Sequence, residues 1–333
     1  MDRLSLVEFS LTSFIIFLFH IIFEMGNSIR VSAISAFYKK GKYLKKFLDE
    51  VPHQTYFSNL EIVFDHNEPI DDEISLINQF QKGFPNHLSY FVTNPVVPIG
   101  VSWNNCIKKS KGEYLTIWNI DDLRTPFSIE RQVEILDKCS HIDIVTGNYT
   151  RVQTFPSEKG SYIDITKIKP HEMMKNFHLG PFFMFRKNIC KKAGYFDEQF
   201  KCANDHDFAL RLLSHGKLFI INENLGFFLD ENTGLSTKPG SLCPIESTVI
   251  HLRYGNYDKV EYRLLPSALR YDIYHIKYGD QWVPVENYIP HYHEMLEEKF
   301  DNLFSKGLLL NLKTNARKII MELIKTSDKV KEY

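Results

Sequence analysis

Two adjacent carboxylates, Asp121 and Asp122, follow the strand-like run EYLTIWNI, and Asn119 stands two residues before the first of them. Two neighbouring acids in a sheltered place need a counter-ion. A hard divalent cation that also binds phosphate oxygens is one that carboxylates favour. The alternative is a solvated turn with one aspartate capping the next helix, but Thr125 and Pro126 are suited to that cap and first turn.

A second acidic cluster, Asn204-Asp205-His206-Asp207, precedes the apolar run FALRLL. A carboxylate at the start of a helix can act as a general base that takes a proton from an attacking hydroxyl. That role requires hydrogen-bond reach and a suitable pKa. The alternative is an ordinary N-cap with a solvated neighbour, and the cluster alone does not decide between the two.

Alternating strands and helices must position these side chains. Runs of β-branched and small residues predict strands at 30–37, 60–66, 89–94, 113–122 and 141–152. Runs with helical spacing predict intervening helices at 43–51, 71–84, 101–111 and 128–139. Such alternation predicts a mainly parallel sheet, in which ligands bind outside the carboxyl ends of the strands. Polar side chains at these ends are Tyr38, Asp65, Asn94 and the Asp121–Asp122 pair.

The later chain is less regular. Residues 152–180 are weakly patterned, 204–216 predict a helix and 217–229 a further strand. From about residue 245 the chain is rich in Tyr and His and then helical. It ends in the amphipathic run ARKIIMELIKTSDKVKEY, which favours a packed helix over one lying on a membrane.

Composition is that of a folded protein. The 333 residues are 44% hydrophobic, 14% aromatic and 24% charged, which excludes disordered, collagenous and multi-span membrane classes. Forty basic and 41 acidic residues give a net charge of -1, so no strong positive field attracts nucleic acid. The five cysteines form no C-x-x-C pair, and we expect free thiols in a reducing, cytoplasmic compartment.

One apolar run, FSLTSFIIFLFHIIF from Phe9 to Phe23, departs from this soluble pattern. It is shorter than the roughly 20 residues that a bilayer span needs, and no A-x-A-like cleavage site follows it. A spanning anchor, an uncleaved signal and a peripheral helix stay open. So does the interpretation that translation starts at Met25 and that residues 1–24 are upstream read-through.

Taken in order, the motifs resemble the family 2 glycosyltransferases, inverting enzymes of the GT-A fold, over about residues 30–240. VSAISAFYKKGKYLKKFL, LEIVFDH and VSWNNCIKKSKGEYLTIWNIDDLR are similar to the family's opening strand and helix, its second strand, and the stretch that ends in its metal motif. GPFFMFRK, KKAGYFDEQF and NDHDFALRL are similar to its acceptor-side strand, its G-x-F-D-E turn and the segment with the catalytic base.

This resemblance implies an α/β fold with a Rossmann-like, mainly parallel sheet flanked by helices. The glycosyltransferase domain would cover residues 25–240, after the apolar segment 1–24 and before a largely helical C-terminal extension, 241–333. It also implies transfer of one sugar from a nucleotide-diphosphate sugar, UDP-linked in the first instance, to a glycan or lipid-linked acceptor. No Q-x-x-R-W pattern of a processive synthase follows. Peripheral membrane contact stays open, and nucleic acid is not expected as a partner.

Roles carry over from the resemblance residue by residue. Ala36 and Tyr38 would border the nucleotide, with Asn94 at the same sheet edge, and Asp65 would contact the base or ribose. Asp65-His66 replaces the family's usual Asp-Asp, so the position of this contact is uncertain by one residue.

The resemblance also assigns the chemistry. Asp121 and Asp122 would hold the diphosphate through Mn²⁺ or Mg²⁺, and Asp205 would be the base. The loop GFFLDENTGLSTKPGS lacks the Arg or His often found there, and Lys238 is the substitute for holding the diphosphate.

Two rival functions remain. A catalytically silent GT-A module that binds nucleotide is suggested by Asn119 and Asn204 where the family often has acids, although Asp122 and Asp205 are retained. A sugar nucleotidyltransferase would need a G-x-G-T-R loop after the first strand, and none is present. Two C-terminal motifs can be interpreted as structural or as functional. His291-Tyr292-His293-Glu294 is more typical of a surface than of a metal site, and YGDQWVPVENYIPHY of packing than of sugar stacking.

Overall fold

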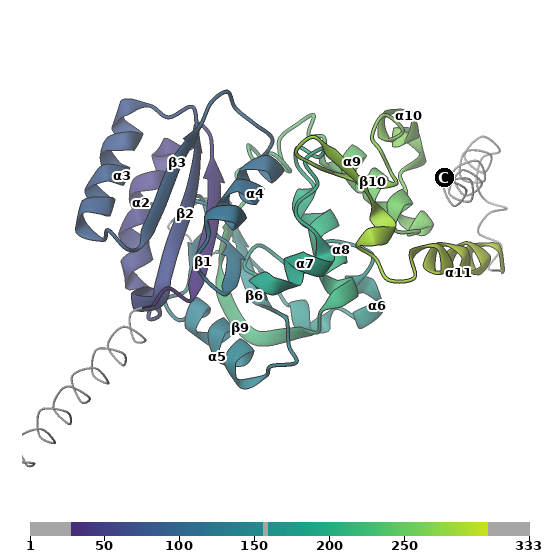
Figure 1. Cartoon of the computed structure of the whole chain (residues 1–333), viewed down its shortest axis with the longest axis horizontal. Helices are drawn as coiled ribbons and strands as arrows, with labels where there is room; N and C mark the ends of the chain where they lie inside the picture. The colour runs from purple at the N-terminus through teal and green to yellow at the C-terminus, as the bar shows by residue number, and fades with distance from the viewer. Residues whose placement is uncertain (1–27, 156–158, 306–333) are drawn as a thin grey trace, which may run out of the picture.

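A single curved sheet organises the computed structural model, which describes residues 28–155 and 159–305 (Figure 1). The strand order is β3-β2-β1-β4-β8-β6-β9-β5, with β7 paired to β6 beside this path. The strands are β1 Val31–Phe37, β2 Leu60–Asn67, β3 Leu88–Thr93, β4 Tyr114–Ile117, β5 Leu123–Arg124, β6 Ile144–Val152, β7 Ser161–Ile163, β8 Met184–Arg186 and β9 Leu218–Leu229. The first four are parallel to one another, as predicted, whereas β8 is antiparallel to β4 and β6.

Helices follow the strands of the first half in the predicted alternation. They are α2 Gly41–Glu50, α3 Asp71–Gly83, α4 Ile99–Lys109 and α5 Ser128–Lys138. Later helices are α6 Pro170–Met173, α7 Cys190–Ala193, α8 Asn204–His215, α9 Cys243–Arg253, α10 Leu265–Ala268 and α11 Tyr292–Ser305. The mixed α/β architecture with a mainly parallel sheet is therefore confirmed.

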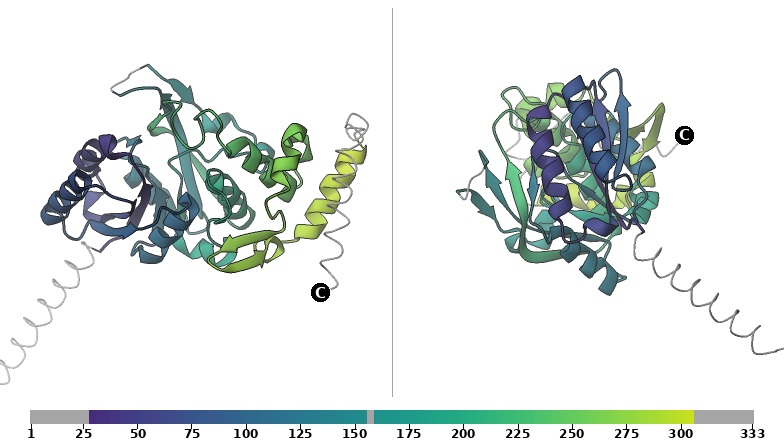
Figure 2. Two further views of the ribbon diagram at one scale, coloured as in Figure 1. Left: turned by 90° about the horizontal axis from the view of Figure 1, so that it is seen from above. Right: turned by 90° about the vertical axis from the view of Figure 1, so that its left-hand side faces the viewer.

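Side-chain alternation along the strands builds two cores, one on each face of the sheet. In β1, Ala33 packs with residues of α2, α3 and α5, whereas its neighbour Ile34 packs with residues of α4 and α8. In β2, Phe64 belongs to the same core as Ala33, and Val63 to the same core as Ile34. Figure 2 shows α2 and α3 side by side over one face. The two layers leave the carboxyl ends of β1 to β4 as a free edge between them.

A third core joins the later helices to the sheet domain. Phe200 and Leu210 pack with Val249 and Ile250 of α9 and with residues of the two-stranded hairpin β10 His275–Tyr278 and β11 Gln281–Pro284. The part of the expected extension that the structure describes, 241–305, thus contains a hairpin besides its helices. Figure 2 shows α11 at the opposite end of the molecule from α2 and α3.

Two local predictions are wrong. The fourth strand ends at Ile117 rather than continuing to Asp122, because the chain turns there to form the short β5. Thr125 does not cap α5. Its hydroxyl donates to the carbonyls of Asn224 and Leu225, since β9 passes beside it, and the N-cap is Phe127. The weakly patterned stretch forms β7 and α6 against partners distant in sequence.

The expectation of five free thiols is also wrong. Cys202 and Cys243 form a disulfide, with their Cα atoms 5.4 Å apart, and Cys106, Cys139 and Cys190 are free. The pairing spans 41 residues and joins the segment just before α8 to the first residue of α9. Structural disulfides are rare in reducing compartments, so the cysteines no longer support a cytoplasmic location.

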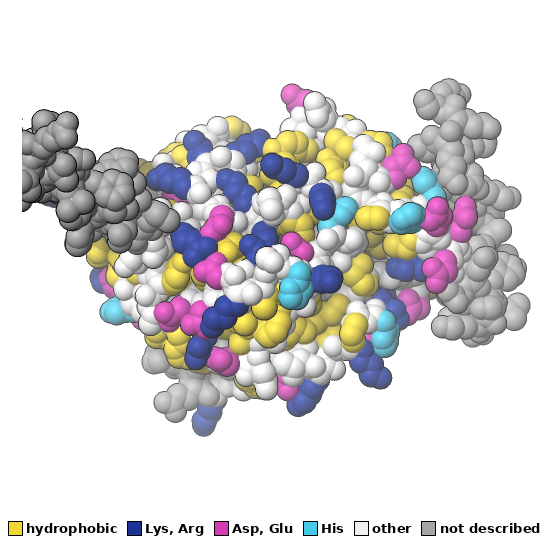
Figure 3. All heavy atoms as spheres, turned by 60° about the horizontal axis from the view of Figure 1, so that its bottom comes forward, with side chains coloured by type: hydrophobic (Ala, Val, Ile, Leu, Met, Phe, Trp, Pro, Cys, Tyr) yellow, Lys and Arg dark blue, Asp and Glu magenta, His cyan; other side chains and the backbone are white. Residues whose placement is uncertain are grey.

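Among the described residues, no helix has the length and apolar character needed to cross a bilayer. The predictions for the run Phe9–Phe23 and for the C-terminal amphipathic run both lie outside those residues. On the face in Figure 3, Lys and Arg side chains are interspersed with Asp and Glu instead of forming one basic surface, in line with the net charge of -1.

Candidate active site

Parallel pairing brings most of the predicted donor contacts to one edge of the sheet, here called the donor edge (the carboxyl ends of β1 to β4). Ala36 of β1 pairs with Asp65 of β2, and β3 lies next to β2. Tyr38 follows β1 directly and is 38% exposed, and Asn94 follows β3 and is also exposed. The side chains that the sequence placed at strand ends therefore share this edge.

Asp65 lies deeper than a strand-end position would place it. Strand β2 continues to Asn67, and the Asp65 side chain is fully buried on the face that α4 covers. Neither of its carboxylate oxygens has a hydrogen-bond partner among the described residues. Burial raises the pKa of Asp65, while nearby Thr93 and Ser102 oppose the shift.

Lys40 forms an ion pair with Asp121, with 2.9 Å between Nζ and Oδ2. The Asp121 side chain is 23% exposed and that of Lys40 is 29% exposed, so both remain open to solvent and to a ligand. Lys40 precedes α2 and reaches across the donor edge from the end of β1, while Asp121 follows β4, the strand paired with β1. No local sequence pattern predicts this contact.

Asp122 has the opposite environment. Only 2% of it is exposed, and both of its oxygens are used within the protein: Oδ1 accepts from the N–H of Leu229 at 3.1 Å and Oδ2 from the amide of Asn119 at 3.3 Å. Burial, followed by the charge of Asp121, raises its pKa well above the ordinary range. Asp122 thereby joins the end of β4 to the end of β9.

Asp205 lies in the first turn of α8, as predicted, and α8 begins against the donor edge. The start of α4 touches the start of α8 so closely that a Cβ at Gly100 would collide with the amide of Asn204. Oδ1 of Asp205 accepts from the N–H of His206 at 2.8 Å, and its side chain has no ion pair among the described residues. Burial raises the pKa of Asp205 to about 6, and the charge of Glu246 adds to this.

Asp207, two residues after Asp205 in the first turn of α8, is held by cations. It accepts from Arg211 at 2.8 Å, from Arg253 at 2.7 Å and from the hydroxyl of Tyr254 at 2.8 Å, and these pairs are fully buried. The two guanidinium groups lower its pKa to about 2 against the effect of burial. Two acids of one helix turn thus have opposite electrostatic environments.

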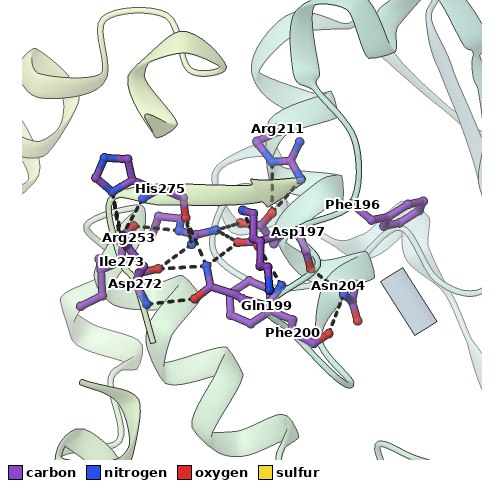
Figure 4. Close-up of polar contacts among 12 residues, drawn as sticks. Phe196, Asp197, Gln199, Phe200, Asn204, Arg211, Arg253, Asp272, Ile273 and His275 are labelled. Carbon is purple, nitrogen blue, oxygen red and sulfur yellow. Dashed lines mark hydrogen bonds and ion pairs between the residues drawn. The ribbon is translucent and has the colours of Figure 1, made fainter. Parts of the chain in front are cut away.

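Arg253 also binds Asp197 of the predicted G-x-F-D-E turn at 2.9 Å, as Figure 4 shows. It donates further to the carbonyls of Asp272, Ile273 and His275. Asn204 donates to the carbonyls of Asp197 and Phe200 in the same region. This network connects α8 to α9 and the hairpin.

No hydrogen bond or ion pair joins Lys238 to Asp121 in the described part of the chain. Lys238 lies exposed in the loop after β9, where its backbone N–H donates to Gly234. The start of that loop does approach the donor edge, because Glu231 accepts from Lys42 at 2.9 Å and also from the Tyr43 hydroxyl. His291 and His293 each contact a single glutamate at the surface, as the structural interpretation expected.

Asp121 suits a divalent cation better than Asp122 does. Its carboxylate is partly exposed and held only by a displaceable lysine, whereas both oxygens of Asp122 already accept from N–H groups. In the described part of the chain, no three His, Cys, Asp or Glu side chains are arranged as a metal site. Mg²⁺ commonly binds one or two carboxylates and completes its shell with substrate phosphates and water. The residues present therefore fit a metal that arrives with a diphosphate.

The parallel sheet, its donor edge and the acidic start of α8 define a glycosyltransferase of the GT-A type. The chain belongs to glycosyltransferase family 2: the model described as glycosyl transferase family 2 matches residues 32–197, about half of its length.

Two curated relatives, both described as uncharacterized glycosyltransferases, agree. The protein from Methanocaldococcus jannaschii is 24% identical over 208 residues, covering 60% of this chain and 70% of its own length. The protein from Rickettsia typhi is 26% identical over 208 residues, covering 59% of this chain and 62% of its own length.

Solved structures support the fold. S. aureus TarS 1–349 in complex with UDP-GlcNAc matches with a TM-score of 0.57 and 14% identity, covering 89% of this chain and 82% of that one. Its complex with UDP matches with a TM-score of 0.53 and 14% identity, covering 86% and 76%. At this identity the likeness establishes the GT-A fold alone.

Proposed function

We propose that this glycosyltransferase is inverting and metal-assisted, and that it moves one sugar from a nucleotide-diphosphate sugar to a hydroxyl of a glycan or lipid-linked acceptor. We further propose UDP as the nucleotide, because TarS was solved with UDP and UDP-GlcNAc. Ala36, Tyr38, Asp65 and Asn94 would surround the nucleoside at the donor edge, and Asp121 would face the diphosphate.

The observation that carries the proposal is the contrast between Asp205 and Asp207. Asp207 is neutralised by two buried arginines and held at a pKa of about 2, whereas Asp205 has no cation partner in the described chain and a pKa of about 6. A general base works best when its pKa lies near the working pH. Of these two acids, only Asp205 combines an unpaired carboxylate with such a value.

In the proposed reaction, the carboxylate of Asp205 takes the proton of the acceptor hydroxyl as its oxygen attacks the anomeric carbon. The bond from that carbon to the diphosphate oxygen breaks on the opposite side, so the configuration inverts. Lys40, freed from Asp121, would pair with the diphosphate. Mn²⁺ or Mg²⁺ held by Asp121 would offset the charge that develops on the leaving group. Asp122 would orient this segment through Leu229 and Asn119.

Asn204 gives little support to a catalytically silent module. Its amide donates to the carbonyls of Asp197 at 2.8 Å and Phe200 at 3.0 Å. A carboxylate at this position would point oxygen at oxygen, because an ionised acid has no N–H to donate. The absence of an acid here therefore has a structural reason that is independent of catalysis.

The proposal is tested by thermal unfolding of the full chain with UDP, GDP, dTDP or CMP, each with Mn²⁺ or with chelator. A ligand at about 100 times its Kd stabilises by about 2.7 kcal/mol, a readily measured shift. We expect stabilisation by UDP that disappears with chelator. Stabilisation by GDP alone would correct the nucleotide. A folded protein that responds to none of the four would contradict donor binding. Stabilisation by UDP without release of UDP from UDP-GlcNAc would favour the silent module.

A further inference from the structure

Glu246 of α9 is a fully buried carboxylate that has no cation partner among the described residues. Its oxygens instead accept from three consecutive backbone N–H groups, those of Lys201, Cys202 and Ala203, each at 2.9 Å. The hydroxyl of Tyr271 donates to it as well, at 3.1 Å. Hydrogen bonds to an ionised acceptor are stronger than neutral ones, so this carboxylate fixes the 201–203 segment firmly.

The anchored segment leads directly into the proposed base. Residues 201–203 immediately precede α8, and Asp205 is the second residue of that helix. A second crosslink joins the same two segments, because the disulfide connects Cys202 to Cys243, one turn before Glu246 on α9. Residues three apart lie on the same helix face. Two independent connections therefore bind the start of α8 to the start of α9.

We propose that Glu246 is a positioning residue for sugar transfer: it holds the start of α8 so that the carboxylate of Asp205 faces the acceptor hydroxyl. The inference rests on the proposed function, since it takes Asp205 as the base. It gives the chain beyond the family match, which ends at residue 197, a defined task in catalysis.

The charge of Glu246 acts on Asp205 in addition to its hydrogen bonds. Burial is the main cause of the raised pKa of Asp205, and Glu246 is the one neighbouring charge that adds to it. The N–H of His206 acts in the opposite direction. Removing the charge of Glu246 should therefore lower the pKa of Asp205, which a merely structural role for Glu246 would not require.

The test compares the wild-type full chain with Glu246→Gln and Glu246→Asp. The Asp205 carboxyl is titrated by NMR in protein labelled with ¹³C-aspartate, with Asp205→Asn identifying its resonance. This measurement needs no donor. We expect a lower midpoint in Glu246→Gln, which loses the charge, and a midpoint near that of the wild type in Glu246→Asp, which keeps it.

Release of UDP from UDP-GlcNAc provides the kinetic readout. We expect Glu246→Asp to lower kcat by about 10²-fold, because withdrawing the anchor by one methylene misplaces the base on the ångström scale. Its KM for the donor should change little, since the hydrogen bonds of Glu246 go to residues 201–203 and Tyr271 and not to residues of the donor edge. Glu61→Gln is the control: Glu61 of β2 is another fully buried acid that accepts from a hydroxyl and one backbone N–H, and it also pairs with Lys111 at 3.6 Å.

An unchanged midpoint in Glu246→Gln, or wild-type turnover by both Glu246 variants while Asp205→Asn is inactive, would overturn the inference and leave the proposed function intact. Wild-type turnover by Asp205→Asn would overturn the proposed function and the inference together. An equal shift in Glu61→Gln would show that the effect is not specific to Glu246 and would also overturn the inference.

Discussion

The donor edge and the junction between α8 and α9 use the same kinds of side chain in different ways. At the donor edge, Lys40 and Asp121 are partly exposed and paired once. At the junction, Asp207 and Arg253 are fully buried, bind each other and make further hydrogen bonds within the protein. A ligand can displace an exposed pair at small cost, whereas breaking a buried pair leaves an uncompensated charge. We therefore expect the ion pair at the donor edge to open when a ligand binds, and the buried pairs at the junction to keep α8 and α9 in place.

The largest effect is expected from removing a buried ion pair at the junction. Arg253→Met leaves Asp197 and Asp207 buried without their shared cation, and we expect a loss of about 3–5 kcal/mol in the free energy of unfolding. Denaturant titration measures it. Arg131→Met, at an exposed pair on α5, is the control and should cost at most about 1 kcal/mol. Equal costs for the two variants would contradict the distinction.

At the donor edge, Asp121→Asn should remove ligand binding without removing the fold. The variant keeps the size of the side chain but loses the charge proposed to hold the metal. We expect the Mn²⁺-dependent stabilisation by UDP, about 2.7 kcal/mol at 100 times the Kd, to disappear while the unliganded melting temperature changes little. Full retention of the UDP response would rule out Asp121 as the metal ligand.

The protonation of Asp205 gives a pH test of the same contrast. The deprotonated form is the active one, so the rate of UDP release should be constant above the pKa of about 6 and fall tenfold per pH unit below it. Asp207, with a pKa of about 2, should stay ionised in this range and should not change the pH dependence of the rate. A pH–rate profile measured at saturating donor checks this. A flat profile down to pH 4 would exclude Asp205 as the base.

The smallest effect is expected at Lys40. Lys40→Met removes the cation proposed to pass from Asp121 to the diphosphate, and a charge-assisted bond of about 1.5 kcal/mol corresponds to roughly tenfold weaker UDP binding. Isothermal titration can resolve this. Lys42→Met, which removes the exposed contact with Glu231, is the control and should bind UDP like the wild type. Unaltered affinity of Lys40→Met for UDP would show that Lys40 does not bind the diphosphate.

Much of the fold was predictable because its signals are local. The buried runs of β1 to β3 and the spacing of apolar residues in α2 to α5 are contained in short stretches of sequence, and the GT-A class followed from their order. The short strands β5 and β7 were harder to place because pairing partners, rather than their own residues, define them.

The candidate site was predictable only in part. Asp121 and Asp205 stand out through their place after a strand and before a helix. Lys40, Glu246 and the Cys202–Cys243 pair act across long sequence separations that no local pattern contains. Glu246 stands among apolar residues in CPIESTVIHLR, and a buried acid needs a partner, but the residues that supply it, 201–203, lie outside that stretch.

The most direct test of the account compares Asp205→Asn with the wild type at equal occupancy of the donor site. The two proteins should show the same thermal stabilisation by UDP with Mn²⁺. The release of UDP from UDP-GlcNAc should fall by about 10²- to 10⁴-fold in the variant, the usual contribution of a general base. Wild-type release by a variant that binds UDP normally would contradict the assignment of Asp205 and, with it, the division of the molecule into a binding edge and a catalytic helix.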